Sequence, residues 1–163
     1  MKLSSITRAG IPGLICAFLL AGCATQPARK LPGEVSVQKR ALSGEIAHKA
    51  MSLVGRPYRY GGADPVTGFD CSGLVRFVFN QVGIEAPRTV AEQYQTVRAV
   101  PLRDVIAGDL LFFKIDRSRI SHVAIYAGSG RFVHAPRSGR QVELRSLDDA
   151  FYKARFAGAG RLF

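Results

Sequence analysis

The sequence predicts an α+β domain in which N-terminal helices pack on a central antiparallel sheet. Apolar residues recur at helical spacing over 45–54 and 71–82, in the first part of the domain. From about residue 97 the pattern changes to short β-branched or aromatic runs separated by glycine-containing turns. Because the helical segments come first and the strands afterwards, we expect the two kinds of element to be segregated, with antiparallel strands.

The expected helices have recognisable ends. The first covers 45–54 and is followed by Gly55, a residue suited to a helix C-terminus. The second begins at Cys71 and continues to Val82, where glycine follows. A third, short helix is indicated at 89–92 by the Thr-x-x-Glu spacing of a capping box.

The expected strands follow the helices. They cover 110–114, 123–126, 131–134 and 142–144. The turn Gly128-Ser129-Gly130 predicts a tight hairpin that joins the segments carrying His122 and His134, so the two imidazoles can face one another. We expect a last short helix over 148–153 and a closing segment over 156–162.

The first 22 residues have the pattern of an export signal, with basic Lys2 and Arg8 before an apolar run over 11–20. Leu-Ala-Gly-Cys, ending at Cys23, resembles a bacterial lipobox, which implies lipid on that cysteine. Alanine follows Cys23, which by the same resemblance implies an outer-membrane lipoprotein facing the periplasm of a Gram-negative cell. An ordinary secretory signal with an incidental cysteine is the alternative.

The mature chain is expected to have a tether and one compact domain. Residues 23–42 are rich in proline, glutamine and basic side chains, and we expect them to form a lipidated, flexible tether. The domain is expected to occupy 43–163 and to be monomeric. The formal net charge is +11. This positive charge is consistent with attraction to an anionic wall polymer or lipid surface. The alternative is that it serves only solubility.

Cys71 is expected to be the nucleophile of a cysteine hydrolase. Of the three cysteines, Cys16 lies in the export signal and Cys23 in the lipobox, so Cys71 is the one free thiol of the mature chain. A helix N-terminus favours a thiolate, which is the reactive form of cysteine. His122 and His134 follow far downstream, as base and orienting group would.

Six segments of the chain carry a family resemblance. They are Tyr-Arg-Tyr-Gly-Gly at 58–62, Gly-Phe-Asp-Cys-Ser-Gly-Leu-Val at 68–75, Pro-Arg-Thr at 87–89, Gly-Asp-Leu-Leu-Phe-Phe at 108–113, Ser-His-Val-Ala-Ile-Tyr at 121–126 and Phe-Val-His-Ala at 132–135. In this order and spacing, they make residues 43–163 resemble the NlpC family of papain-like cell-wall cysteine peptidases. The resemblance implies a papain-like fold, and hydrolysis of peptidoglycan peptide stems through an acyl-enzyme on Cys71.

The resemblance also implies roles for other residues. His122 is expected to be the general base, since imidazole titrates near neutral pH, and by resemblance His134 orients it. Tyr58 matches the family's active-site tyrosine and is expected to support the oxyanion, with Tyr60 as the other candidate.

The residues flanking Cys71 have two compatible expected roles. By resemblance, Asp70 and Ser72 help to bind the free amine or polar stem of the substrate. Asp70 is also a good helix N-cap whatever the function. Away from these motifs, His48 is expected to be solvated and Asp109 to be a turn residue.

Several functions fit these residues. By resemblance, the bond cut is D-alanyl–diaminopimelate or γ-D-glutamyl–diaminopimelate. The alternatives are a lactyl–L-alanine amidase or an acyltransferase of the same superfamily, or a non-catalytic wall-binding lipoprotein. The sequence has no metal-ligand motif and no phosphate-binding loop, so no metal or other cofactor is expected. No long basic run is interleaved with aromatic residues, and nucleic acid is therefore not an expected partner.

Overall fold

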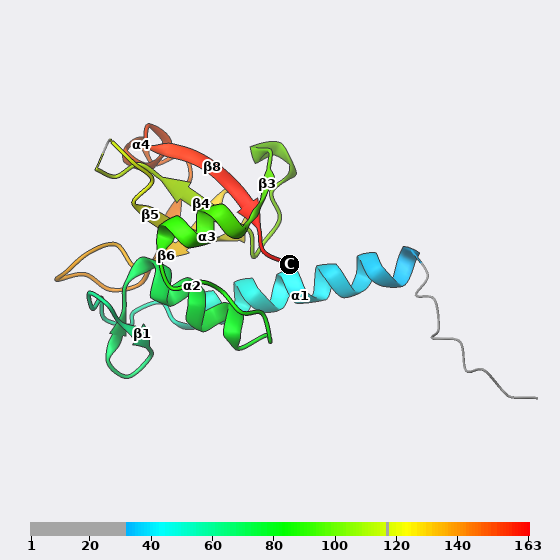
Figure 1. Cartoon of the computed structure of the whole chain (residues 1–163), viewed down its shortest axis with the longest axis horizontal. Coiled ribbons are helices and arrows are strands. Elements are labelled where there is room, and N and C mark those ends of the chain that lie inside the picture. Colours follow the sequence, from blue (N-terminus) through cyan, green and yellow to red (C-terminus); the bar gives the residue numbers. More distant parts are fainter. Residues whose placement is uncertain (1–31, 117) are drawn as a thin grey trace, which may run out of the picture.

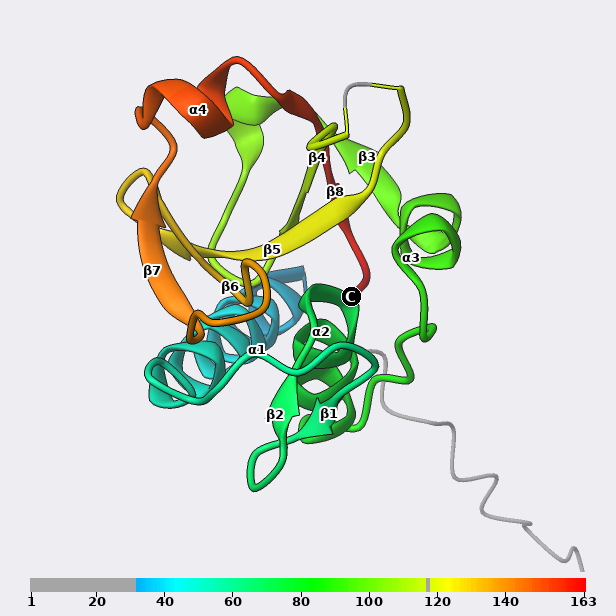
Figure 2. The ribbon, with the colours of Figure 1, turned by 90° about the vertical axis from the view of Figure 1, so that its left-hand side faces the viewer.

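The computed structural model describes residues 32–116 and 118–163, and it confirms the α+β class. Its helices are α1 (Pro32–Ser52), α2 (Cys71–Asn80), α3 (Val90–Thr96) and α4 (Ala150–Lys153), with a 3-10 turn at Leu102–Asp104. A curved sheet has α1 and α2 on one face, and α4 lies on the opposite, concave side (Figure 1, Figure 2).

The main sheet has six strands in the order β3-β8-β4-β5-β6-β7, and all neighbours are antiparallel. Its strands are β3 (Arg98–Val100), β4 (Leu110–Phe113), β5 (His122–Gly128), β6 (Arg131–His134), β7 (Glu143–Ser146) and β8 (Phe156–Arg161). The closing segment expected near the C-terminus is therefore a strand, and it pairs between β3 and β4. Two short strands before α2, β1 (Ala63–Asp64) and β2 (Gly68–Phe69), form a separate small hairpin.

Alternating side chains of the central strands form two cores. The core between the sheet and the long helices includes Ile46, Leu74, Val123, Ile125 and Val133. The core inside the curve includes Leu111, Phe113, Ala124, Phe132 and the half-buried Tyr152. Successive residues of a strand face opposite sides, so His122 lies on the concave side while Val123 faces the helices.

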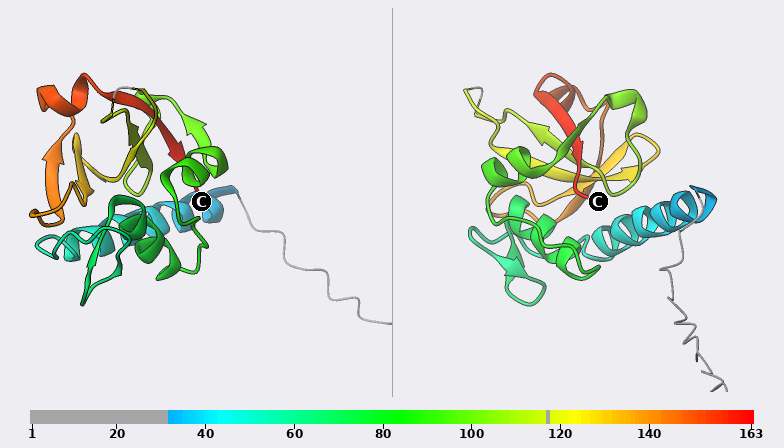
Figure 3. Two further views of the ribbon diagram at one scale, coloured as in Figure 1. Left: turned by 60° about the vertical axis from the view of Figure 1, so that its left-hand side comes forward. Right: turned by 45° about the vertical axis from the view of Figure 1, so that its right-hand side comes forward.

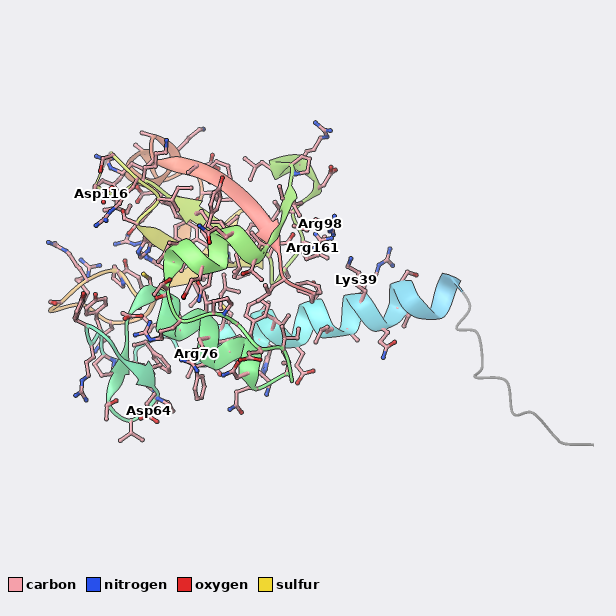
Figure 4. The ribbon with its side chains drawn as sticks, viewed as in Figure 1. Lys39, Asp64, Arg76, Arg98, Asp116 and Arg161 are labelled. Carbon is pink, nitrogen blue, oxygen red and sulfur yellow. The ribbon has the colours of Figure 1, made fainter. Side chains whose placement is uncertain are left out.

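The helix α1 begins earlier than the sequence predicted. The expected tether ended at residue 42, but the structure is helical from Pro32, and the first turns of α1 extend beyond the sheet (Figure 3). Proline suits the first turn of a helix because its missing N–H would have no partner there. The C-terminus provides a contact, since Lys39 Nζ lies 6.0 Å from the ring centre of Phe163 (Figure 4).

The predicted export signal at 1–22 and the predicted lipid site at Cys23 lie outside the described residues. Within the described ranges, no helix is both long enough and apolar enough to cross a membrane. Membrane attachment of this chain therefore stays a prediction from the sequence.

Local signals in the sequence correctly placed two further features. The capping box at the start of α3 is present: Glu92 N–H donates to Thr89 Oγ1, and the Glu92 carboxylate accepts from Thr89 N–H at 3.0 Å. The turn at 128–130 joins β5 and β6 as an antiparallel hairpin, in which Ile125 is opposite Val133. This hairpin brings His122 and His134 onto neighbouring strands.

Candidate active site

Cys71 is the first residue of α2, as the sequence predicted. Asp70 caps this helix by accepting a hydrogen bond from Gly73 N–H at 2.6 Å. The thiol lies against β5, where the backbone N–H of Val123 interacts with it. Cys71 is the one free cysteine in the described part of the chain.

His122 and His134 are in direct contact, which confirms the geometry that the hairpin predicted. His122 Nε2 lies 2.9 Å from His134 Nδ1, with the two rings perpendicular. His122 is 6 % exposed and His134 is fully buried. Cys71 is placed near this pair by packing of α2 on β5, the strand that begins at His122, since the backbone N–H of Val123 interacts with the thiol.

Burial governs the protonation of this cluster. It raises the pKa of Cys71 to about 11 and lowers the pKa of His122 to about 3. Burial likewise lowers the pKa of His134 to about 4. From the sequence, the helix start was expected to favour the thiolate. In the structure, desolvation raises the pKa of Cys71 by more than the N–H groups of Val123 and Ser72 lower it. At neutral pH, the resting cluster is therefore a thiol with two neutral imidazoles.

The two tyrosines that the sequence left open differ in burial. Tyr58 is half-buried and packs against the same core as Cys71, and Tyr60 is 88 % exposed. Burial raises the pKa of Tyr58, and the negative charges that Cys71 and Asp70 carry when ionised raise it further. The role of Tyr58 in supporting the oxyanion stays a prediction.

Asp70 and Ser72 belong to a network centred on Arg88, a residue of the Pro-Arg-Thr motif for which the sequence predicted no role. The guanidinium of Arg88 donates to Asp70 Oδ2 at 2.6 Å, and it also donates to Ser72 Oγ at 3.0 Å. Gly61 N–H donates to the same carboxylate at 3.0 Å. Both carboxylate oxygens thus have partners within the protein, and the capping role of Asp70 is the one that the structure displays.

Two further residues lie behind His134. Glu143 Oε1 and the hydroxyl of Tyr152 are each 3.3 Å from His134 Nε2. The sequence gave no indication of either residue, because they follow no motif and come from β7 and α4. The available signal was that Glu143 comes one strand after His134 and, in the antiparallel register, lies directly opposite it.

A cavity of about 510 Å³ opens next to the histidine cluster. We call it the arginine cavity; its walls include His122, Arg137, Arg140, Glu143, Arg145 and Tyr152. Arg140 and Arg145 both pair with Glu143, at 2.6 and 2.9 Å. No carboxylate of the described residues pairs with Arg137, which is exposed.

Two residues that the sequence placed outside the site are indeed elsewhere. His48 is exposed on α1. Asp109 is fully buried in the turn before β4, where it accepts from Ile106 N–H and pairs with Arg161 of β8 at 2.6 Å (Figure 4). The Asp109–Arg161 pair therefore holds the sheet together at a distance from Cys71.

Curated relatives match most of the domain. The murein DD-endopeptidase MepH of Escherichia coli (strain K12) is 40 % identical over 143 residues, which cover 76 % of this chain and 53 % of the relative. A gamma-D-glutamyl-L-lysine dipeptidyl-peptidase of Bacillus subtilis (strain 168) is 34 % identical, with coverage of 77 % and 43 %. The chain thus spans about half the length of these relatives, or less.

Solved structures and a family pattern agree with these matches. The NlpC/p60 domain of the peptidoglycan hydrolase SagA has a TM-score of 0.64 and 33 % identity, covering 74 % of this chain and 97 % of that domain. A family protein from Bacillus cereus has a TM-score of 0.69 and 34 % identity, covering 74 % and 40 %. The pattern of the NlpC/P60 family matches residues 55–161. The chain belongs to the NlpC/P60 family.

Proposed function

We propose that this protein is a peptidoglycan endopeptidase in which Cys71 attacks an amide bond of the peptide stem or cross-link. The observation that carries the proposal is the His122–His134 contact beside α2, the helix that begins at Cys71 and packs on the strand of His122. The names of the E. coli and B. subtilis relatives support a wall peptide as the substrate class.

The chemistry follows from the atoms of the cluster. His122 Nε2 contacts His134, so Nδ1 is the ring nitrogen available to take the Cys71 proton. As the proton moves, Sγ bonds to the carbonyl carbon and the carbonyl oxygen becomes an oxyanion. The C–N bond then breaks as His122 returns the proton to the leaving amine. A water molecule, deprotonated by His122, hydrolyses the thioester and regenerates the thiol.

The neutral resting state affects how this reaction begins. Burial raises the pKa of the Cys71 thiol and lowers the pKa of the His122 imidazole, so it favours the neutral pair over a thiolate with an imidazolium. We therefore expect the proton transfer to accompany the attack on the carbonyl. The backbone N–H of Cys71 lies at the thiol and is suited to donate to the developing oxyanion, and by resemblance to the family the Tyr58 hydroxyl is the second donor.

The arginine cavity suits a substrate with free carboxylates, such as a stem peptide. Arg137 lines the same cavity as His122, and no carboxylate of the described residues pairs with it. We expect Arg137→Ala to raise KM for a soluble muropeptide by about tenfold, since a charge-assisted hydrogen bond contributes about 1.5–3 kcal/mol. The value of kcat should change little.

The matched control is Arg76→Ala, which removes the same charge from the exposed side of α2 (Figure 4). Steady-state kinetics of the two variants measure the difference. An equal KM for both would contradict a carboxylate subsite at Arg137, whatever the activity of the wild type.

We further propose that the chain is a monomeric lipoprotein of the outer membrane, anchored through Cys23 and facing the periplasm. The Leu-Ala-Gly-Cys sequence supports this assignment. Cys23→Ser should move the protein from the membrane fraction to the soluble fraction, as judged by immunoblotting, while hydrolysis of soluble muropeptides continues. Retention of the variant in the membrane fraction would contradict lipid attachment at this residue.

A further inference from the structure

We propose that Glu143 is a positioning residue of the catalytic site, whose carboxylate sets the tautomer of His134 and, through it, that of His122. This role rests on the proposed function and adds a fourth member to the cysteine–histidine–histidine cluster. The three side chains that follow Cys71 in the cluster come from the adjacent strands β5, β6 and β7.

Glu143 is placed to act on His134 by the sheet itself. The two residues are direct cross-strand partners in the β6–β7 register. Glu143 Oε1 lies 3.3 Å from His134 Nε2, and the imidazole is fully buried. An ionised carboxylate accepts hydrogen bonds and donates none, so it selects the His134 tautomer that carries its proton on Nε2.

Two arginines hold Glu143 in its ionised form. Arg140 donates to Oε2 at 2.6 Å, and Arg145 donates to Oε1 at 2.9 Å. Burial raises the pKa of Glu143, but these two hydrogen bonds and the neighbouring charges outweigh it, and the net shift is downward. At neutral pH, Glu143 therefore acts as an acceptor.

The tautomer of His134 determines the tautomer of His122 through the hydrogen bond between the two rings. With the proton on Nε2, His134 presents the lone pair of Nδ1 to His122 Nε2, 2.9 Å away. His122 must then carry its own proton on Nε2 to make this hydrogen bond. Its Nδ1 is left unprotonated, as a base facing Cys71 needs to be.

Tyr152 cannot replace Glu143 in this role. Its hydroxyl is also 3.3 Å from His134 Nε2, but a hydroxyl can donate or accept and so selects neither tautomer. Arg140 and Arg145 offset the negative charge of Glu143 at His134, so the carboxylate acts through its position as an acceptor.

The test replaces Glu143 with glutamine in the full chain, with Glu85→Gln, the same chemical change at an exposed residue, as the matched control. The amide of Glu143→Gln can turn its NH2 group towards His134 and so favour the reversed tautomer. We expect kcat for muropeptide hydrolysis to fall by about 10- to 100-fold, the range found when a carboxylate that orients a metal-bound histidine is lost. KM should not rise, and Glu85→Gln should retain the activity of the wild type.

Long-range ¹H–¹⁵N spectra of the imidazoles provide a second readout that needs no substrate. In the wild type, we expect both His134 and His122 to be protonated on Nε2, with protonation on Nδ1 appearing in Glu143→Gln. Wild-type protonation of His134 on Nδ1 would overturn the proposal, as would an unchanged kcat in the variant. If the wild type cleaves no wall peptide, the spectra still decide the role of Glu143 separately from the proposed function.

Discussion

Cys71→Ala is expected to abolish cleavage of peptidoglycan while the domain stays folded. The substitution removes the nucleophile, so kcat should fall by at least about 10⁴-fold, as it does when a catalytic triad loses its nucleophile. Little volume is lost, because the change removes only the sulfur atom of a side chain at the edge of the core. Circular dichroism and the melting temperature should therefore stay close to those of the wild type.

Cys71→Ser provides the sharper comparison. It keeps the hydrogen-bonding capacity and most of the volume, but a hydroxyl is a much poorer nucleophile than a thiol beside a neutral imidazole. We expect it to be as inactive as the alanine variant in a muropeptide assay. Wild-type rates in either folded variant would remove Cys71 from the mechanism.

Gly73→Ala is expected to cause a large loss of stability. A Cβ at this position would overlap the backbone carbonyl oxygen of Gly62, in the loop that crosses the start of α2. The same oxygen accepts from Asp70 N–H at 3.0 Å, so the loop cannot move away without losing that bond. Overpacking of this kind costs about 1–3 kcal/mol. The melting temperature should fall by roughly 5–10 °C.

Gly44→Ala is the matched control, because a Cβ at Gly44 in α1 meets nothing within 4 Å. There the substitution should be neutral or slightly stabilising, since alanine favours helix more than glycine does. Thermal unfolding of the two variants gives the comparison. Equal melting temperatures would show that the contact between Gly62 and Gly73 is not tight.

The local signals of the sequence were sufficient for most of the fold. The Thr89 capping box, the 128–130 turn and the runs of strand residues each depend on near neighbours, and the structure confirms them. The extension of α1 to Pro32 was missed because its early turns lack an apolar stripe in the sequence, and residues 36–41 are mostly exposed. Val37, for example, is 67 % exposed.

The residues of the candidate site also differ in whether local sequence patterns could predict them. Cys71, His122 and His134 lie in motifs, and the hairpin placed the two histidines together. Arg88 also lies in a motif, but its contact with Asp70 depends on tertiary packing. The contacts of Glu143 and Tyr152 with His134 depend on tertiary packing as well, which no local pattern specifies. The protonation state was also missed, because the helix start is a local feature whereas the burial that raises the pKa of Cys71 comes from the whole fold.

Mass spectrometry of a peptidoglycan digest tests the central claim most directly. Purified wall sacculi are incubated with the wild type or with Cys71→Ala, and the soluble muropeptides are then compared. Cleavage of D-alanyl–diaminopimelate converts cross-linked dimers to monomers, whereas cleavage of γ-D-glutamyl–diaminopimelate leaves disaccharides that carry dipeptides. We expect one of these two patterns with the wild type and neither with the variant. Sugars released free of peptide would instead indicate an amidase, and an unchanged digest would contradict the proposed function.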